Sequence, residues 1–158
     1  MRRRLITRCV PTIGHMKKIG ILNGPLSAAI ARLGRTDGLV VGDAGLPIPT
    51  GPERVDLAPV PGTPNLLEVV RAVAREMMIE RALLATEMAT ASSAFRQVLD
   101  ALLAEISSLQ GSPIAIDVCP HEQFKSRTVH ARAVVRTGEC TPYANIILYS
   151  GVAFGRQG

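Results

Sequence analysis

Hydrophobic residues along the chain follow two spacings, the three-to-four residue repeat of helices and the short runs typical of buried strands. Leu26, Ile30 and Leu33 follow the helical repeat, and Gly34 fits its end. Proline in the first turn marks a helix start, and an apolar stripe marks a helix face. The predicted helices begin at Asn23-Gly24-Pro25 and at Thr63-Pro64, and a third is marked by Phe95 to Ile106.

Short apolar runs bounded by Gly, Pro or polar residues predict the strands. The segment from Met77 to Thr86 is ambiguous, because its composition favours a helix whereas alternation with the helices requires a strand. Since helix and strand patterns alternate throughout, we expect a single α/β domain with a mainly parallel central sheet flanked by helices. The other predicted strands are Ile19 to Leu22, Leu39 to Val41, Val55 to Leu57, Ile114 to Val118, Val134-Val135 and Ile146 to Tyr149.

The strand Leu39 to Val41 ends abruptly in Gly42-Asp43-Ala44-Gly45. Open α/β sheets bind ligands beyond the carboxyl ends of their strands, so Asp43 is a candidate hydroxyl acceptor or general base. An Asp in such a loop also commonly bonds its own backbone to form a turn, and the sequence leaves both interpretations open. The loop matches neither a dinucleotide fingerprint nor a phosphate-binding P-loop.

His121 follows the strand Ile114 to Val118 in the same way, and imidazole exchanges protons near neutral pH. Its alternative is a residue on a solvated loop at a helix start. Cys140 lacks an identifiable activating base, so we interpret it as a packed turn residue. Cys119 and His121 without a second ligand pair predict no metal site. His130 is expected at the surface.

The amino-acid composition argues against several classes of function, among them nucleic-acid binding and a membrane-spanning protein. Aromatic residues make up only 3% of the chain and tryptophan is absent, so the core must be aliphatic and no base-stacking platform exists. The net charge is +5, but four of these charges lie in the first eight residues, which argues against a nucleic-acid partner. No apolar run spans a bilayer. Three scattered cysteines indicate a reducing compartment.

Residues 1–15 are basic, contain no acidic residue and follow no packing pattern. They resemble a transit peptide weakly, and they lack the apolar core of a secretory signal. The patterned sequence begins at Met16. We therefore expect residues 1–15 to be a disordered extension or to precede the natural start at Met16, and we expect residues 16–158 to form the domain.

Four separated motifs carry a resemblance to a known family. They are L-G-R-T-D at 33–37, D-A-G-L-P-I-P at 43–49, H-E-Q-F-K at 121–125 and G-E-C-T-P-Y-A-N-I-I-L at 138–148. In this order and spacing they resemble the D-ribose pyranases, which are related to the fucose mutarotases. The similarity extends from about Met16 to Phe154, and the second and third motifs resemble the ribose branch more than the fucose branch.

The resemblance implies a cytoplasmic enzyme that interconverts the pyranose and furanose forms of D-ribose and supplies ribokinase. It implies no metal and no organic cofactor. It also implies ring-like homo-oligomers, typically pentamer-based decamers, with sites between subunits. The implied sugar site comprises Asp43, His121, Tyr143 and Asn145, with Lys125 as a neighbour. These side chains suit a sugar, because a sugar presents uncharged hydroxyls that need donors and acceptors in fixed directions.

The chain departs from the family pattern at Arg35, where the family has a histidine taken as the proton donor. Arginine keeps its proton at neutral pH, and loss of a general acid or base costs about 10²- to 10⁴-fold in rate. Three interpretations remain. Asp43 and His121 share the proton transfers while Arg35 positions the sugar; or the protein binds sugar without turnover; or it is a related mutarotase acting on fucose or on an anionic sugar that Arg35 clamps.

Overall fold

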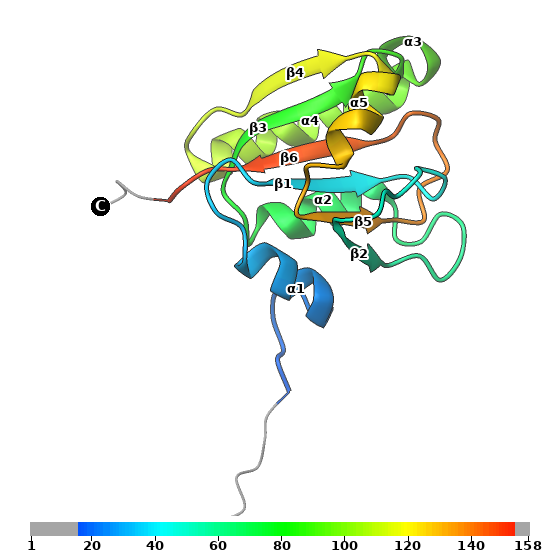
Figure 1. Ribbon diagram of the computed structural model, residues 1–158. Coiled ribbons are helices and arrows are strands. Elements are labelled where there is room, and N and C mark those ends of the chain that lie inside the picture. The colour runs from blue at the N-terminus through cyan, green and yellow to red at the C-terminus, as the bar shows by residue number, and fades with distance from the viewer. Residues whose placement is uncertain (1–15, 154–158) are drawn as a thin grey trace, which may run out of the picture.

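The computed structural model describes residues 16–153, and the predictions for residues 1–15 lie outside this range. A six-stranded sheet in the order β2-β5-β1-β6-β3-β4 forms the centre of the domain (Figure 1). Its strands are β1 (Gly38–Gly42), β2 (Glu53–Asp56), β3 (Ile79–Ala85), β4 (Ala115–Cys119), β5 (Ala133–Arg136) and β6 (Ile146–Ser150). The predicted single α/β domain is confirmed.

Helices cover both faces of the sheet unequally. In Figure 1, α2 and α4 lie behind the sheet and α5 lies in front of it. None of the helices in residues 16–153 is long and apolar enough to cross a bilayer. The helices are α1 (Gly24–Ala31), α2 (Leu66–Ala74), α3 (Met88–Ala91), α4 (Ser93–Gln110) and α5 (His121–Thr128).

The sheet is mainly parallel, with β6 as the exception. Strand β6 runs antiparallel to both of its neighbours, β1 and β3, whereas β1–β5, β2–β5 and β3–β4 are parallel pairs. The carboxyl ends of the parallel strands therefore meet at one edge of the sheet, and the chain enters β6 at that edge. We call this side, where the parallel strands end, the C-edge, and the side where they begin the N-edge. Both names refer to the ends of the strands and not to the outer strands β2 and β4.

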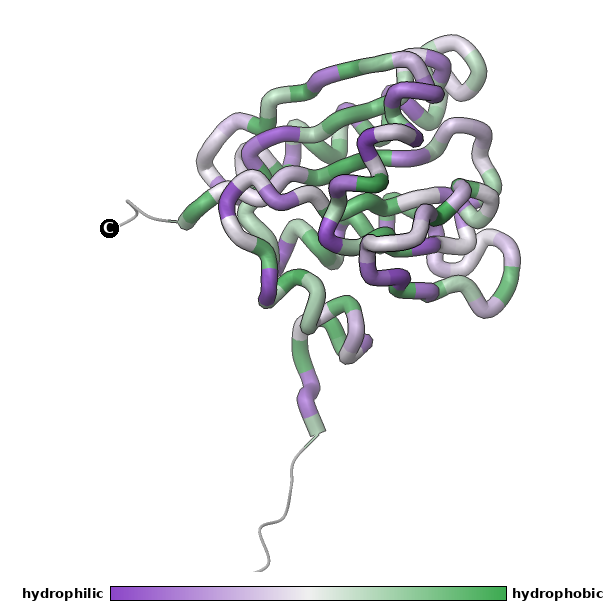
Figure 2. The backbone as a smooth tube through the Cα atoms, in the orientation of Figure 1, coloured by the Kyte–Doolittle hydropathy of each residue, from purple (hydrophilic) through white to green (hydrophobic). Residues whose placement is uncertain are grey.

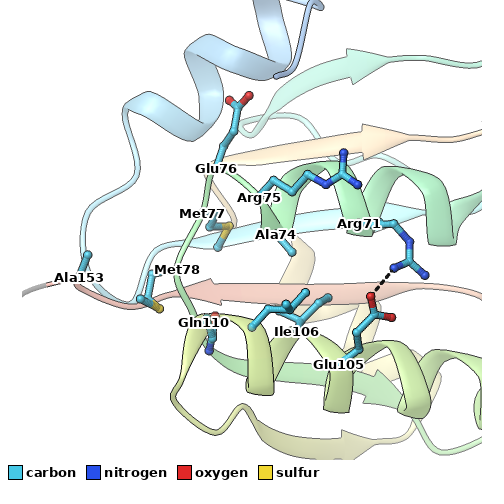
Figure 3. A pocket seen from close by; sticks show the side chains of 11 residues that line it. Arg71, Ala74, Arg75, Glu76, Met77, Met78, Glu105, Ile106, Gln110 and Ala153 are labelled. Atoms are coloured by element: carbon cyan, nitrogen blue, oxygen red, sulfur yellow. Dashed lines mark hydrogen bonds and ion pairs between the residues drawn. The ribbon is translucent and has the colours of Figure 1, made fainter. Parts of the chain in front are cut away.

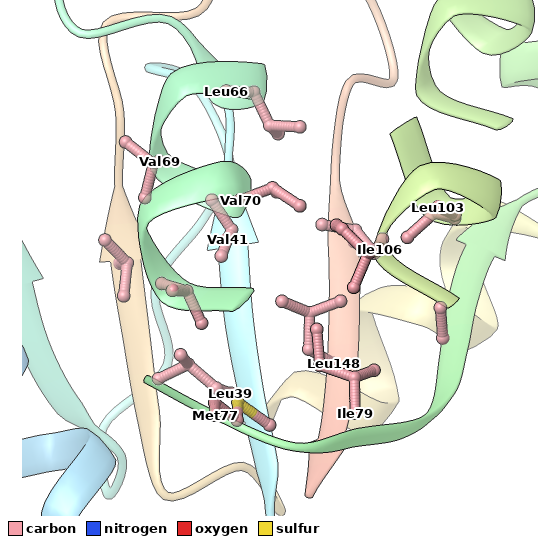
Figure 4. Close-up of a cluster of buried hydrophobic side chains, with 14 of the residues drawn as sticks. Leu39, Val41, Leu66, Val69, Val70, Met77, Ile79, Leu103, Ile106 and Leu148 are labelled. Carbon is pink, nitrogen blue, oxygen red and sulfur yellow. The ribbon is translucent and has the colours of Figure 1, made fainter. Parts of the chain in front are cut away.

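The main core lies between the sheet and helices α1, α2 and α4. Strand β1 is buried along its whole length, as expected for a central strand covered on both faces. Figure 4 shows aliphatic side chains from α2 and α4 packed against those from β1, β3 and β6. The smaller cluster on the other face centres on Phe124 of α5. Hydrophobic stretches accordingly follow the central strands in Figure 2.

The ambiguous segment from Met77 to Thr86 contains strand β3, whose last four residues are buried. Strand β4 is also confirmed, but it is an edge strand with Ile116 and Val118 exposed. Both strands end at the C-edge. The sequence pattern therefore predicted β4 correctly, whereas it left helix and strand open for β3, and it did not indicate that β4 lies at the edge of the sheet.

Three local predictions are wrong. Residues 19–22 form no strand, since Ile19 and Leu22 are exposed and only Ile21 is buried. Helix α2 begins after Thr63-Pro64, because Asn65 caps it: Asn65 Oδ1 accepts from Glu68 N while Glu68 Oε2 accepts from Asn65 N. Helix α1 ends at Ala31, before Gly34.

Candidate functional site

Asp43 and Asn145 form a reciprocal pair at the C-edge. The amide of Asn145 accepts from the backbone N–H of Asp43 at 2.8 Å and donates from Nδ2 to the Asp43 carboxylate at 3.0 Å. The other carboxylate oxygen accepts from Gly45 N at 2.8 Å. Asn145 is buried, with 1% of its surface exposed. Asp43 is therefore both a turn residue and a carboxylate held in a fixed direction, so the two interpretations are compatible.

Tyr143 and His121 meet beside this pair. Their ring centroids are 5.1 Å apart in an edge-to-face arrangement. Tyr143 adopts a φ of 60°, an uncommon conformation for a residue with a side chain, and its carbonyl accepts from Asn145 N at 2.8 Å. The turn that carries Asn145 thus also carries Tyr143. Sequence positions more than one hundred residues apart converge at one edge of the sheet.

The imidazole of His121 has a buried nitrogen without a protein partner. Among the described residues, Nδ1 makes no hydrogen bond. A buried polar atom normally finds a partner, and an orphaned one in a native protein indicates a missing ligand, water or neighbouring chain. His121 therefore brings an imidazole with one unpaired nitrogen to the side of Tyr143.

Glu87 fixes the start of α5 and with it His121. Proline at the N-cap of α5 provides no capping side chain, and both carboxylate oxygens of Glu87 accept from His121 N, at 3.0 and 3.1 Å. This backbone hydrogen bond is the main cause that lowers the pKa of Glu87 below its ordinary value. A negative charge at a helix N-terminus also interacts favourably with the helix dipole.

Lys125 and Arg35 are not in contact with this cluster. Lys125 lies one turn along α5 from His121, and its Nζ is 2.7 Å from Glu122 on the same helix. Arg35 precedes β1, so it lies at the N-edge, where its Nε is 3.5 Å from Glu80 and its side chain is 66% exposed. Strand β1 separates Arg35 from Asp43 within one chain.

The two cysteines in the described part of the chain, Cys119 and Cys140, do not join the site. Cys119 is buried, and burial raises the pKa of its thiol. Cys140 was predicted to be packed, but it is exposed in its turn, where its Sγ lies 3.4 Å from the carbonyl of Gly138. His130 is exposed, as predicted. Within residues 16–153, no group of three or more His, Cys, Asp or Glu side chains is arranged to hold a metal ion.

A hollow of about 460 Å³ lies elsewhere, between the carboxyl ends of α2 and α4. Its walls include Met77, Met78 and Ile106, and an ion pair joins Arg71 to Glu105 at its rim (Figure 3). It is located at the N-edge, where β3 begins. The hollow contains none of the predicted site residues, so the cluster at the C-edge remains the candidate site.

Comparison with known proteins decides the family. Residues 16–153 match the model of the RbsD / FucU transport protein family. The chain belongs to this family. It is 50% identical to the D-ribose pyranase of Aeromonas salmonicida over 139 residues, which cover 88% of this chain and 100% of the relative. It is 48% identical to the D-ribose pyranase of Edwardsiella ictaluri with the same coverage. The resemblance stated from the four motifs is thereby confirmed.

Solved structures of the RbsD / FucU family share the fold. Bacillus subtilis RbsD complexed with D-ribose matches with a TM-score of 0.79 and 42% identity, covering 88% of this chain and 100% of that one. The Streptococcus pneumoniae fucose mutarotase in complex with L-fucose matches with a TM-score of 0.63 at 22% identity, covering 82% and 93%. The second likeness supports the fold alone.

Two acidic residues of the site escaped the sequence analysis. Glu87 follows β3, and the ambiguity of Met77 to Thr86 hid its position at the C-edge. Had β3 been assigned, Glu87 would have stood out as a polar residue after a strand, like Asp43. Glu139 borders the site, because its carbonyl accepts from Ala44 N, next to Asp43. It lies inside the fourth motif, but nothing in the local pattern distinguished it from a solvated turn residue.

Proposed function

We propose that this protein interconverts the pyranose and furanose forms of D-ribose and thereby supplies ribokinase. The observation that carries the proposal is the cluster of Asp43, Asn145, Tyr143 and His121 at one edge of the sheet. The close relatives named as D-ribose pyranases, and the related structure named as complexed with D-ribose, support the same substrate. Lys125 is the proposed additional sugar contact. No cofactor is required for the chemistry.

Acid-base groups suffice for the reaction. A base removes the proton of the anomeric hydroxyl while the bond from the anomeric carbon to the ring oxygen breaks, and that oxygen receives a proton. The open chain then closes through a different hydroxyl, which changes the ring size. Asp43 is held as an acceptor by Asn145, and His121 has a free buried nitrogen. We assign the proton transfers to these two residues.

In this proposal, Arg35 of one subunit contributes to the sugar site of a neighbouring subunit. Within one chain it lies at the N-edge, so a shared site requires the N-edge of one subunit to meet the C-edge of the next. A pentamer-based decamer, the assembly implied for the family, provides such head-to-tail contacts. The unpartnered nitrogen of His121 supports a site completed from outside the chain. We propose this assembly, with a cytoplasmic location.

Magnetisation exchange between the anomeric signals of ribose tests the activity. We expect the protein to accelerate exchange between pyranose and furanose signals above the rate in buffer, and Asp43→Asn to abolish the acceleration. Exchange no faster than in buffer, restored by Arg35→His, overturns the assignment to Asp43 and His121. Ribose binding without exchange in either protein identifies a sugar-binding protein without turnover.

A second candidate substrate is an anionic sugar. A hollow of about 250 Å³ at the N-edge is lined by Arg81, Arg127 and His130, next to the segment that carries Arg35. Asp37 also lines this hollow and is paired with Arg132, so the lining carries one carboxylate against two arginines. The excess of arginine favours a phosphate or carboxylate, which arginine binds with two hydrogen bonds. Calorimetry compares the affinity of the protein for ribose 5-phosphate with its affinity for ribose. Tighter binding of the phosphate, lost in Arg35→Ala, supports the anionic substrate, and absence of phosphate binding excludes it.

A further inference from the structure

We propose that Glu139 is a positioning residue that fixes Asp43 relative to Tyr143 and Asn145. The catalytic part of this inference rests on the proposed function, whereas its structural part does not. Glu139 lies between β5 and β6, in the turn that leads to Tyr143 and Asn145. Its side chain and its backbone bind different segments of the C-edge, and each set of contacts has a separate effect.

The carboxylate of Glu139 holds its own turn closed. Its Oε1 accepts from the hydroxyl of Thr141 at 2.7 Å, and from the backbone N–H groups of Thr141 and Cys140 at 3.1 Å each. These bonds fix the residues immediately before Tyr143. The positive φ of Tyr143 thus follows a segment whose backbone donors are already engaged.

The second carboxylate oxygen joins this turn to helix α2. Oε2 accepts from Leu66 N, the first residue of α2, at 3.2 Å. Burial opposes ionisation of Glu139, but the hydrogen bonds from Thr141, Leu66 and Cys140 outweigh it and lower its pKa. Glu139 is therefore a carboxylate at neutral pH, and its charge strengthens each of these bonds.

The backbone of the same residue holds both neighbours of Asp43. The carbonyl of Glu139 accepts from Ala44 N at 2.8 Å. Its N–H donates to Thr137 Oγ1 at 3.1 Å, and that hydroxyl donates to the carbonyl of Gly42 at 2.8 Å. Gly42 and Ala44 flank Asp43. Glu139 thus lies at the junction of the segment that carries Asp43 and the turn that carries Tyr143 and Asn145.

Glutamine cannot replace this carboxylate fully. The oxygens of Glu139 face donors on both sides, the turn on one and Leu66 on the other. An amide has one oxygen and one NH₂ group, so it accepts on one side only and presents a donor to a donor on the other. Alanine removes the side-chain bonds on both sides and keeps the backbone bonds to Ala44 and Thr137. We therefore expect a graded series in which Glu139→Gln retains part of the function that Glu139→Ala loses.

Glu68 provides a matched control on the same helix. It is an exposed glutamate whose carboxylate accepts from Asn65 N at 2.9 Å in the capping box of α2, and it makes no hydrogen bond to the 138–145 turn. Glu68→Ala therefore weakens the start of α2 without releasing the turn. Thermal unfolding of both alanine variants measures how much each destabilises the protein.

Hydrogen exchange and ribose exchange together test the proposal. In Glu139→Ala we expect faster amide exchange at 42–45 and 138–145 with unchanged exchange at 93–110, and about 100-fold slower pyranose-furanose exchange at saturating ribose, because small misplacements of reacting groups cost this much. Glu139→Gln should fall between this variant and the native protein, and Glu68→Ala should stay within about 3-fold of native.

The possible outcomes are distinguishable. Equal loss of ribose exchange in Glu68→Ala and Glu139→Ala, or protection unchanged at 42–45, overturns the positioning role. If the native protein does not accelerate ribose exchange, the proposed function fails, and selective loss of protection at 42–45 and 138–145 still supports Glu139 as the residue that holds the two segments together.

Discussion

Asn145 and Asp43 are joined by two hydrogen bonds that run in opposite directions. The side-chain oxygen of Asn145 accepts from Asp43 N, and its NH₂ group donates to the Asp43 carboxylate. Only a side chain with an acceptor and a donor on one planar group makes both bonds at once. Because Asn145 is buried, its amide has no solvent to replace either partner. Asn145 therefore directs one oxygen of the Asp43 carboxylate, and Gly45 N holds the other.

We predict that Asn145→Asp is more damaging than Asn145→Ala. Aspartate keeps the acceptor for Asp43 N but places a second carboxylate against the first, and like charges at this distance repel strongly when partly buried. The free energy of unfolding should fall by about 3 kcal/mol in Asn145→Asp and about 2 kcal/mol in Asn145→Ala. Urea denaturation at neutral pH measures both values.

Asn23→Ala is the control for these variants. Asn23 is exposed and caps α1 through a bond from Leu26 N at 2.9 Å, so its loss costs about 1 kcal/mol without reaching the site. Ribose binding should therefore survive in Asn23→Ala and be lost in both Asn145 variants. Native ribose affinity in Asn145→Ala would show that Asp43 needs no partner.

The central part of the fold follows from sequence pattern because burial dictates it. Leu39, Val40 and Val41 lie in a strand covered on both faces, and an uninterrupted apolar run is what such a strand requires. The apolar run at 19–22 has the same appearance, but no neighbouring strand pairs with it, and Ile19 remains exposed. Strand pairing depends on distant residues, so a local pattern cannot decide it.

In the site, too, some residues could be predicted from local pattern and others depend on distant parts of the chain. Asp43 and His121 follow predicted strands, and parallel strands bring such positions to one edge. Tyr143 and Asn145 were identified only through the family motif, since no spacing connects them to Asp43. Arg35 is close to Asp43 in sequence, yet the strand between them sends the two side chains to opposite edges. The role of Glu139 depends on hydrogen bonds to three segments, which no sequence pattern contains.

Mixed oligomers test whether Arg35 and Asp43 of different subunits form one site. We predict that Arg35→Ala and Asp43→Ala are each inactive, and that oligomers formed from an equal mixture recover activity. If each site uses Arg35 of one subunit and Asp43 of its neighbour, random mixing restores about a quarter of the sites. The double variant mixed with the native chain corrects for dilution. No recovery, with mixed oligomers confirmed by mass spectrometry, contradicts a shared site.

We predict that the order of helix α5 depends on pH through Glu87. Its pKa lies below the ordinary value of 4.5, mainly because His121 N donates to it. A carboxylate with a lowered pKa in the folded protein contributes its full stabilisation above its unfolded-state pKa, and this is lost as the pH falls through the lowered value. We therefore predict that amide protection at 121–124 decreases from about pH 5 downwards in the native protein.

The variant Glu87→Gln should remove this pH dependence, because its amide does not titrate in this range. At neutral pH the variant should show about 10-fold slower ribose exchange, since His121 is less well positioned. Glu105→Gln, an exposed change on α4 whose partner is Arg71, is the control, because it removes a titrating carboxylate without touching α5. A decrease in protection at 121–124 that is equally steep in the native protein and in Glu87→Gln would assign it to another group.

Gly138 sets how closely the turn at 138–145 approaches the segment that precedes helix α2. A Cβ atom at this position would overlap the backbone of Thr63, which does not move aside as a flexible side chain does. The backbone of Gly138 is also bonded on both sides, since its N–H donates to Pro64 O at 2.8 Å and its carbonyl accepts from Gly62 N. We predict that Gly138→Ala lowers the free energy of unfolding by about 2 kcal/mol, the typical cost of overpacking.

The same change should weaken ribose binding, because any shift of Gly138 displaces Glu139 and through it Ala44 and the turn before Tyr143. Gly24→Ala is the matched control, since nothing lies within 4 Å of a Cβ placed there and alanine favours the helix that begins at this residue. Urea denaturation should show Gly24→Ala at or slightly above native stability. Unchanged stability and ribose binding in Gly138→Ala would mean that the Thr63 segment moves freely, and that the turn does not depend on its contact with it.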